Sequence, residues 1–235
     1  MARPEYLEIT CKSAIHRVQG MPYLKWSLNP YGGCAHRCQY CFAVQYRVVA
    51  DQGTQQDFGT RLFIKKNVLE VLGRELERPR LQGEHITLGT ATDPYQPVEG
   101  RYQLTRGALR LLRDHANPVS LLTKSPMIVR DVDVLAELVR VASVQVFFSI
   151  TTVDLELWRS VEPGTANPFQ RLRALRALRE AGVPAGVLMA PVLPGLTDSA
   201  ACIEAVAAAA REHKAAYFSA SALRLAPHVK ELYLG

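Results

Sequence analysis

The hydrophobic and polar positions after residue 24 repeat one pattern: a short apolar run, a loop, and a segment with apolar residues three or four apart. Short apolar runs predict buried strands, and the three-to-four spacing predicts amphipathic helices. The predicted strands are residues 24–28, 85–92, 119–124, 144–151, 185–195 and 216–225. Strands alternating with helices predict an α/β fold with a parallel sheet, either doubly wound or curled into a partial barrel.

The segments between these strands carry the signals of helix ends. Thr105 is placed to cap the helix before the third strand, and Asn167 with Pro168 to start the helix before the fifth. Gly182 is placed to stop that helix, and Asp198 to cap the last one. The apolar residues expected to face the sheet are Val68, Leu72, Leu76, Val134, Leu135, Leu138, Val139, Leu172, Leu175 and Leu178.

The composition is that of a globular protein. A hydrophobic fraction of 48% and a charged fraction of 21% allow 235 residues to form one domain with a sizeable core. Glu5, Glu8 and Lys12 interrupt the N-terminal segment, and no run reaches about 18 apolar residues, so we expect a cytoplasmic protein that does not enter a membrane. We divide the chain into an N-terminal extension, 1–23, and a core domain, 24–235. The net charge of +6 permits contact with nucleic acid without requiring it.

Three of the five cysteines lie in one short loop, "CAHRCQYC", and they are Cys34, Cys38 and Cys41. In a reducing compartment, clustered cysteines favour a metal or redox site over disulfides. Iron–sulfur cubanes ordinarily take four thiolates, so three would leave one iron open to a substrate or cofactor. Zinc, with His36 as a fourth ligand, is the alternative. The separate Cys11 and Cys202 are expected to be small buried hydrophobic residues.

Four of the predicted strands end in small or polar residues followed by loops, in "GTATDPYQP", "TKSP", "SITTVD" and "APVLPGLTD". The cysteine loop follows the first strand in the same way. Because ligand sites in parallel α/β folds lie at the carboxyl ends of the strands, these loops are expected to surround one site.

These stretches together carry a resemblance. "SLNPYGGCAHRCQYCFA", "LGTATDPYQPVEGRYQLTR", "LLTKSP", "FSITT" and "MAPVLPGLTD" resemble the radical S-adenosylmethionine (radical SAM) superfamily, and within it the spore-photoproduct-lyase-like group, often labelled DNA repair photolyases. The resemblance implies a partial (β/α)6 TIM-like barrel. It implies a [4Fe–4S] cluster on the three loop cysteines, with SAM on the open iron. It also implies that SAM lies against Tyr40, Thr92, Lys124 and Ser149.

The chemistry implied by the resemblance is reduction of the cluster by a flavodoxin- or ferredoxin-like partner and cleavage of SAM to a 5′-deoxyadenosyl radical, which abstracts hydrogen from a substrate. A nucleic acid or nucleotide is the substrate we expect. A peptide or small molecule is one alternative. A non-catalytic zinc or iron–sulfur protein that binds nucleic acid is another.

The chain departs from the group in two places. A cysteine that serves the lyase as hydrogen donor would stand three residues before Asp93, where this chain has Thr90, so we do not expect repair of spore photoproduct itself. Tyr95 and Tyr102 are the candidate catalytic residues in its place. The C-terminal extension typical of relatives is expected to be absent. Asp93 itself either orients a ligand or opens a turn. One helix carries four arginines that meet phosphates or form a solvated face: Arg171, Arg173, Arg176 and Arg179.

Overall fold

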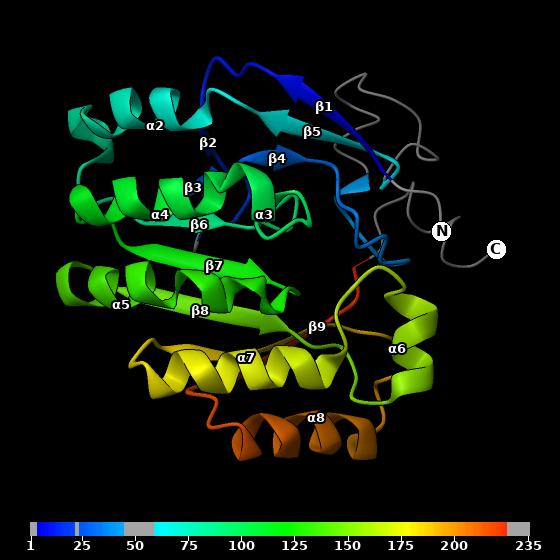
Figure 1. Cartoon of the computed structure of the whole chain (residues 1–235). Helices are drawn as coiled ribbons and strands as arrows, with labels where there is room; N and C mark the ends of the chain where they lie inside the picture. Colours follow the sequence, from blue (N-terminus) through cyan, green and yellow to red (C-terminus); the bar gives the residue numbers. More distant parts are fainter. Residues whose placement is uncertain (1–3, 22–23, 45–58, 225–235) are drawn as a thin grey trace.

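The computed structural model describes residues 4–21, 24–44 and 59–224, and its main feature is a curved seven-stranded sheet (Figure 1). The strands in order across this sheet are β10 (Phe218–Ala222), β9 (Ala185–Val192), β8 (Val144–Ser149), β7 (Val119–Thr123), β6 (Ile86–Leu88), β3 (Trp26–Leu28) and β2 (Ile15–Arg17). All neighbours pair in parallel except β2, which pairs with β3 in the antiparallel sense. The six predicted strands and their parallel arrangement are confirmed, and the sheet is that of a partial barrel.

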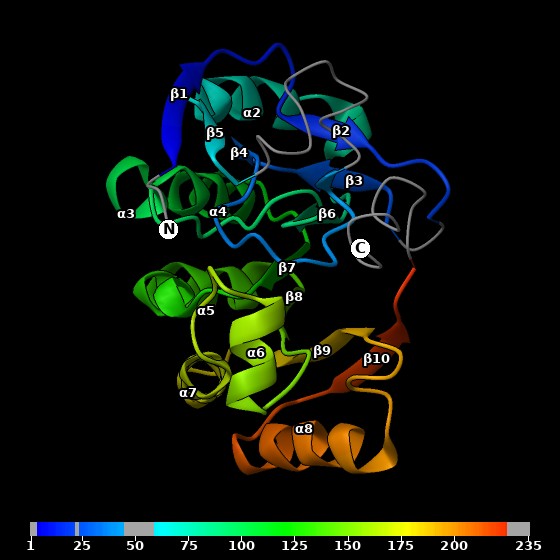
Figure 2. The same cartoon turned by 90° about the vertical axis from the view of Figure 1, so that its right-hand side faces the viewer.

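The helices lie along one side of this sheet and at the carboxyl ends of its strands (Figure 1). They are α2 (Val68–Leu76), α3 (Glu99–Tyr102), α4 (Leu104–Asp114), α5 (Val132–Val141), α6 (Leu155–Val161), α7 (Pro168–Glu180) and α8 (Ala200–Glu212), with the 3-10 turns η2 (Pro79–Leu81) and η3 (Pro126–Asp131). Figure 2 shows α2, α4, α5 and α7 along the outer side of the sheet, which curves from β2 to β10. Of the apolar residues expected to face the sheet, Val139 is half-buried and packs against the core, and the others are buried. Every helix in the described ranges is too short or too polar to cross a membrane.

The helix ends confirm some predictions and correct others. Asn167 caps α7, accepting a hydrogen bond from the backbone of Phe169 at 2.8 Å, and Gly182 has the positive φ of 81° expected after a helix. Thr105 does not cap α4: it lies inside the helix, fully buried, and its hydroxyl donates to the Pro94 carbonyl at 2.5 Å. Asp198 does not cap α8 either, because the adjacent Ser199 takes that position.

A second, smaller sheet was not predicted. Its strands, in the order β1 (Glu5–Ile9), β5 (Arg61–Lys65) and β4 (Tyr31–Gly32), come from distant parts of the sequence. The segment before residue 24 is further tied to the core by Glu75 of α2, which accepts hydrogen bonds from the backbone of Ala14 at 3.0 Å and of Ile15 at 2.9 Å. The division at residues 23 and 24 stays a prediction.

Candidate cofactor-binding site

The cysteine loop, residues 34–41, follows β4 and is held against the turn that ends α6. The backbone of Gln39 donates to the Val161 carbonyl at 3.0 Å, and that of Gly164 donates to the His36 carbonyl at 3.1 Å. A Cβ at Gly164 would lie 2.4 Å from the carbonyl oxygen of Ala35. Only glycine permits this close approach, so the turn and the loop form one rigid unit.

The three thiols of this loop are close enough to affect one another. Cys34 is buried, Cys38 and Cys41 are half-buried, and none forms a disulfide. Burial raises the pKa of Cys38 well above its ordinary value and the pKa of Cys41 to about 12, and nearby thiolates add to both effects. Burial also raises the pKa of Cys34, but the adjacent His36 outweighs it and the net shift is downward. Cys38 and Cys41 are therefore neutral thiols in the loop by itself, and a cationic centre that binds sulfur would bring their pKa values down, so this donor set fits an iron–sulfur cluster.

The described residues do not form a mononuclear zinc site. Within the described ranges, no three His, Cys, Asp or Glu side chains are arranged to hold a single metal ion. His36, the expected fourth zinc ligand, is 5% exposed and its Nδ1 lies 3.4 Å from Oδ2 of Asp93. A cubane cluster binds its thiolates through different irons, so it does not require them to meet at one point.

Two of the residues expected to contact SAM lie in direct contact beside this loop. Nζ of Lys124 donates to Oγ of Ser149, and the backbone N–H of Lys124 donates to Oδ2 of Asp93 at 2.7 Å. Oδ1 of Asp93 accepts from the backbone of Tyr95 at 2.8 Å, which confirms the turn. Thr92 is buried and its hydroxyl donates to the carbonyl of Gly33, next to Cys34. The carboxyl ends of the strands therefore meet the cysteine loop as expected.

Glu162 is a buried carboxylate that contacts Tyr40, Lys124 and Arg171, and its position in the site was not predicted. It is 1% exposed and accepts a hydrogen bond from the hydroxyl of Tyr40. Oε2 lies 2.5 Å from Nη2 of Arg171, and Oε1 lies 3.5 Å from Nζ of Lys124. Burial raises the pKa of Glu162, but Lys124 and Arg171 outweigh burial and bring the pKa down to about 2. Glu162 thus faces two cations, and a second carboxylate, Asp93, lies against the backbone of Lys124, so both positive charges have an acidic neighbour.

Arg171 corrects the interpretation of the arginine-rich helix. It neither meets solvent nor is free for phosphate, because it is fully buried and donates to the carbonyls of Ser149 and Ala166, each at 2.8 Å. Arg176 does lie on a solvated face, where it pairs with Glu180 at 2.9 Å.

The two candidate hydrogen donors lie in different surroundings. Tyr95 is 1% exposed and packs in the main core. The hydroxyl of Tyr102 donates to Glu8 of β1 at 2.7 Å. Thr90 accepts a hydrogen bond from the side chain of Asn29 at 3.0 Å. A catalytic role for either tyrosine stays a prediction, which these contacts do not support.

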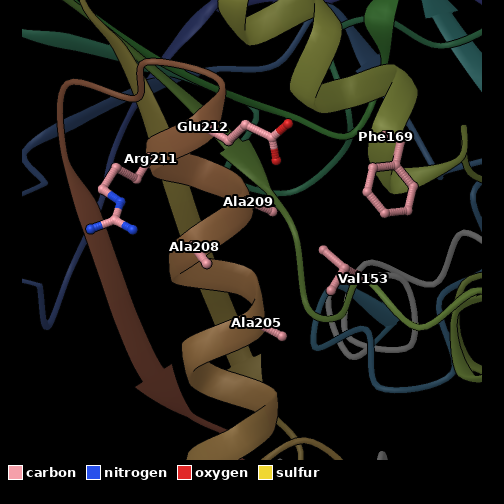
Figure 3. A pocket seen from close by; sticks show the side chains of 7 residues that line it. All are labelled: Val153, Phe169, Ala205, Ala208, Ala209, Arg211 and Glu212. Carbon is pink, nitrogen blue, oxygen red and sulfur yellow. The ribbon is translucent and has the colours of Figure 1, made fainter.

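A cavity of about 650 Å³ lies away from these residues, between α8, the start of α7 and the loop after β8. Figure 3 shows Ala205 and Ala209 of α8 on the side that faces Phe169 and Val153. Its lining contains no cysteine and none of the candidate site residues, and of the strand-end stretches it includes Val153 alone, so we do not assign the chemistry to it.

Comparisons with known proteins agree with this geometry. The family model of the radical SAM superfamily matches residues 28–204. An uncharacterised protein of Mycobacterium tuberculosis strain H37Rv is 43% identical over 194 residues, which cover 82% of this chain and 57% of that protein. An uncharacterised protein of Methanocaldococcus jannaschii is 27% identical over 194 residues, covering 83% of this chain and 70% of that protein. This chain therefore spans little more than half the length of the mycobacterial relative.

Solved structures share the fold. A spore photoproduct lyase variant with bound AdoMet and dinucleoside spore photoproduct has a TM-score of 0.71 at 16% identity, covering 97% of this chain and 65% of that chain. SuiB of Streptococcus suis bound to its precursor peptide SuiA has a TM-score of 0.52 at 14% identity, covering 95% of this chain and 40% of that chain.

Proposed function

Because the chain belongs to the radical SAM superfamily, whose enzymes use a [4Fe–4S] cluster and S-adenosylmethionine, we propose that its cluster binds Cys34, Cys38 and Cys41. When bound, the cluster and SAM supply reductive cleavage of SAM to a 5′-deoxyadenosyl radical that abstracts hydrogen from the substrate. A flavodoxin- or ferredoxin-like protein is the proposed electron donor. The observation that carries this proposal is the placement of three free thiols in one rigid loop at the carboxyl ends of the parallel strands.

The side chains beside the loop have separate tasks in this proposal. Lys124 binds the carboxylate of SAM, because its acidic neighbour Glu162 lies 3.5 Å away and is paired more closely with Arg171, at 2.5 Å. Ser149 and Thr92 are short hydroxyl groups that orient the polar groups of SAM. Tyr40 is anchored by Glu162, so its ring has a fixed position next to Cys41 for packing near the adenine.

We further propose that the substrate is a nucleic acid or nucleotide. One support is the net charge of +6. The other is the fold: the TM-score is 0.71 to a protein bound to a dinucleoside and 0.52 to a protein bound to a peptide. Thr90 stands where the lyase has its cysteine, so the proposed reaction is not repair of spore photoproduct.

The test is anaerobic reconstitution with iron and sulfide, followed by a chemical reductant and SAM, with 5′-deoxyadenosine as the measured product. Replacing Cys34, Cys38 or Cys41 by Ala should abolish both the bound iron and this product. The matched control is Cys202→Ala, a half-buried cysteine of α8, which should retain both. Bound iron that persists in all three loop variants, or a reconstituted protein that forms no 5′-deoxyadenosine, would contradict the proposal.

A further inference from the structure

A second cavity, of about 480 Å³, lies directly beside the cysteine loop. Residues that flank the loop form part of its lining: Gly32 and Gly33 directly before Cys34, and Ala43 two residues after Cys41. Ala91, the neighbour of Thr92, lines it as well. The volume falls within the range of pockets that bind small ligands, which is about 300–1,000 Å³. A ligand in this cavity would contact Gly33 and Ala91, the chain neighbours of Cys34 and Thr92.

The outer wall of this cavity, within residues 9–16, is fixed by two polar side chains. Asn67 stands at the start of α2 but makes no capping bond; its amide instead accepts from the backbone N–H of Cys11 at 2.8 Å and donates to the Cys11 carbonyl at 3.0 Å. Glu75 accepts from the hydroxyl of Ser13 at 2.7 Å and from the backbone of Ala14 at 3.0 Å. The cavity is therefore preformed, which lowers the entropy cost of binding a ligand.

The charged side chains that line this cavity are basic, and the acidic Glu75 behind the wall is engaged by Ser13 and the backbone of Ala14. Lys12 and Lys65 line it together with His16, and none of its lining residues is acidic. Lys65 is half-buried, and its ammonium donates to the carbonyl of Asn29 at 2.8 Å. Within the described ranges no carboxylate lies at ion-pair distance from it, in contrast to the next residue, Lys66, which lies 3.9 Å from Glu8. A half-buried ammonium without a counter-ion favours an anionic ligand.

The rest of the lining is apolar and aromatic. Ile9, Tyr31 and Phe63 contribute to it, and Phe63 and Lys65 lie two residues apart on β5, on the same face of that strand. An aromatic side chain beside a cation matches a nucleotide, whose base stacks on a ring while its phosphate meets the charge. Since the ring and the ammonium both line a cavity that reaches the cysteine loop, we propose that this cavity holds a nucleotide unit of the substrate, with Lys65 on its phosphate. This assignment rests on the proposed function, because it places the substrate beside the radical chemistry.

The test uses the full reconstituted chain and two probes: a dinucleotide with one phosphodiester, and the same dinucleoside with a neutral methylphosphonate linkage. Lys65→Gln should weaken binding of the phosphodiester by about tenfold or more, the loss expected for one charge-assisted contact, and leave the methylphosphonate unchanged. The matched control is Lys66→Gln, which removes the adjacent, exposed lysine and should leave both affinities unchanged. Equal affinities of the wild-type protein for the two probes would overturn the proposal.

Cys11 gives a second readout that needs neither a variant nor catalysis, because it lines the same cavity. The phosphodiester dinucleotide should slow alkylation of Cys11 by iodoacetamide, followed peptide by peptide, and leave alkylation of Cys202 unchanged. Protection by the same concentration of inorganic phosphate would show a general anion site and overturn the nucleotide assignment.

The two proposals fail in distinguishable ways. If the dinucleotide protects Cys11 in a protein that forms no 5′-deoxyadenosine, the proposed reaction is contradicted and the phosphate site is supported. If the protein forms 5′-deoxyadenosine but Lys65→Gln leaves its dinucleotide affinity unchanged, only the phosphate site is contradicted.

Discussion

Replacing Arg171 by Met should destabilise the protein strongly, because it removes the main partner of a buried carboxylate. Arg171 is fully buried, and its Nη2 lies 2.5 Å from Oε2 of Glu162. After the change, Lys124 at 3.5 Å is the cation left beside Glu162 among the described side chains. Breaking a buried ion pair by removing one partner costs about 3–5 kcal/mol, a large share of an unfolding free energy of about 5–15 kcal/mol.

The pKa of Glu162 gives a second magnitude, which covers the combined effect of Lys124, Arg171 and Tyr40 on its carboxylate and not that of Arg171 alone. A fall from the ordinary 4.5 to about 2 corresponds to about 3 kcal/mol of stability at neutral pH. Because the pKa in the folded state is lowered, this stability is fully present above about pH 4.5 and is lost as the pH falls towards about 2. The difference in unfolding free energy between wild type and Arg171→Met should therefore be largest near pH 7 and smaller at pH 3.

The assay is urea unfolding of wild type, Arg171→Met, Glu162→Gln and the double variant. Arg176→Met is the matched control: it lies on the same helix and pairs with Glu180, but both side chains are about half exposed, so its loss should cost less than about 1 kcal/mol. A cost for Arg171→Met no larger than that of Arg176→Met would refute the reasoning. So would single-variant costs that add to within about 0.5 kcal/mol in the double variant, since contacting residues should couple.

Three further predictions concern the site and its surroundings. Gly164→Ala should reduce the iron bound after reconstitution, because the added Cβ lies 2.4 Å from a carbonyl oxygen of the cysteine loop. The control is Gly73→Ala, where no atom lies within 4 Å of the new Cβ. This control should leave bound iron unchanged and raise the unfolding free energy by about 0.5–1 kcal/mol. Asn67→Ala should speed alkylation of Cys11, because both backbone hydrogen bonds of Cys11 to the amide are lost; an unchanged rate would refute the fixed wall. Lys124→Met should weaken SAM binding by about tenfold or more at unchanged iron content, measured by anaerobic equilibrium dialysis.

The parts of the fold that the sequence predicted are those with local signals. Apolar runs predicted five of the six parallel strands because burial on the sheet is encoded within each run, whereas β10 is exposed at all five positions and was predicted from its place after the last helix. Asn167 was predicted as a cap because its partner, Phe169, lies two residues away. Thr105 failed as a cap because its hydroxyl is taken by Pro94, an acceptor that only the folded chain brings near. The small sheet was missed for the same reason, since β1 and β5 meet across more than fifty residues of sequence.

The same distinction applies to the site. Lys124, Ser149 and Asp93 were placed together because the carboxyl ends of parallel strands share one edge of the sheet. Glu162 follows α6 in an ordinary-looking turn, and its position among Tyr40, Lys124 and Arg171 depends on tertiary packing. Arg171 did carry a signal, because it lies four residues before Leu175 on the apolar stripe of α7. An arginine on a buried stripe needs a buried carboxylate, and this requirement could have led to Glu162.

Lys124 and Lys65 are proposed to bind two different anions. Lys124 lies on the side of the cysteine loop next to Glu162, and Lys65 lies on the side of the small sheet, in the cavity lined by Gly32 and Gly33. If Lys124 receives the carboxylate of SAM and Lys65 the phosphate of the substrate, each variant should affect one ligand only. Lys124→Met should weaken SAM binding and leave dinucleotide affinity unchanged, and Lys65→Gln should do the reverse. Two variants that weaken both ligands equally would indicate one shared anion site, and the separation of cofactor from substrate across the loop would be wrong.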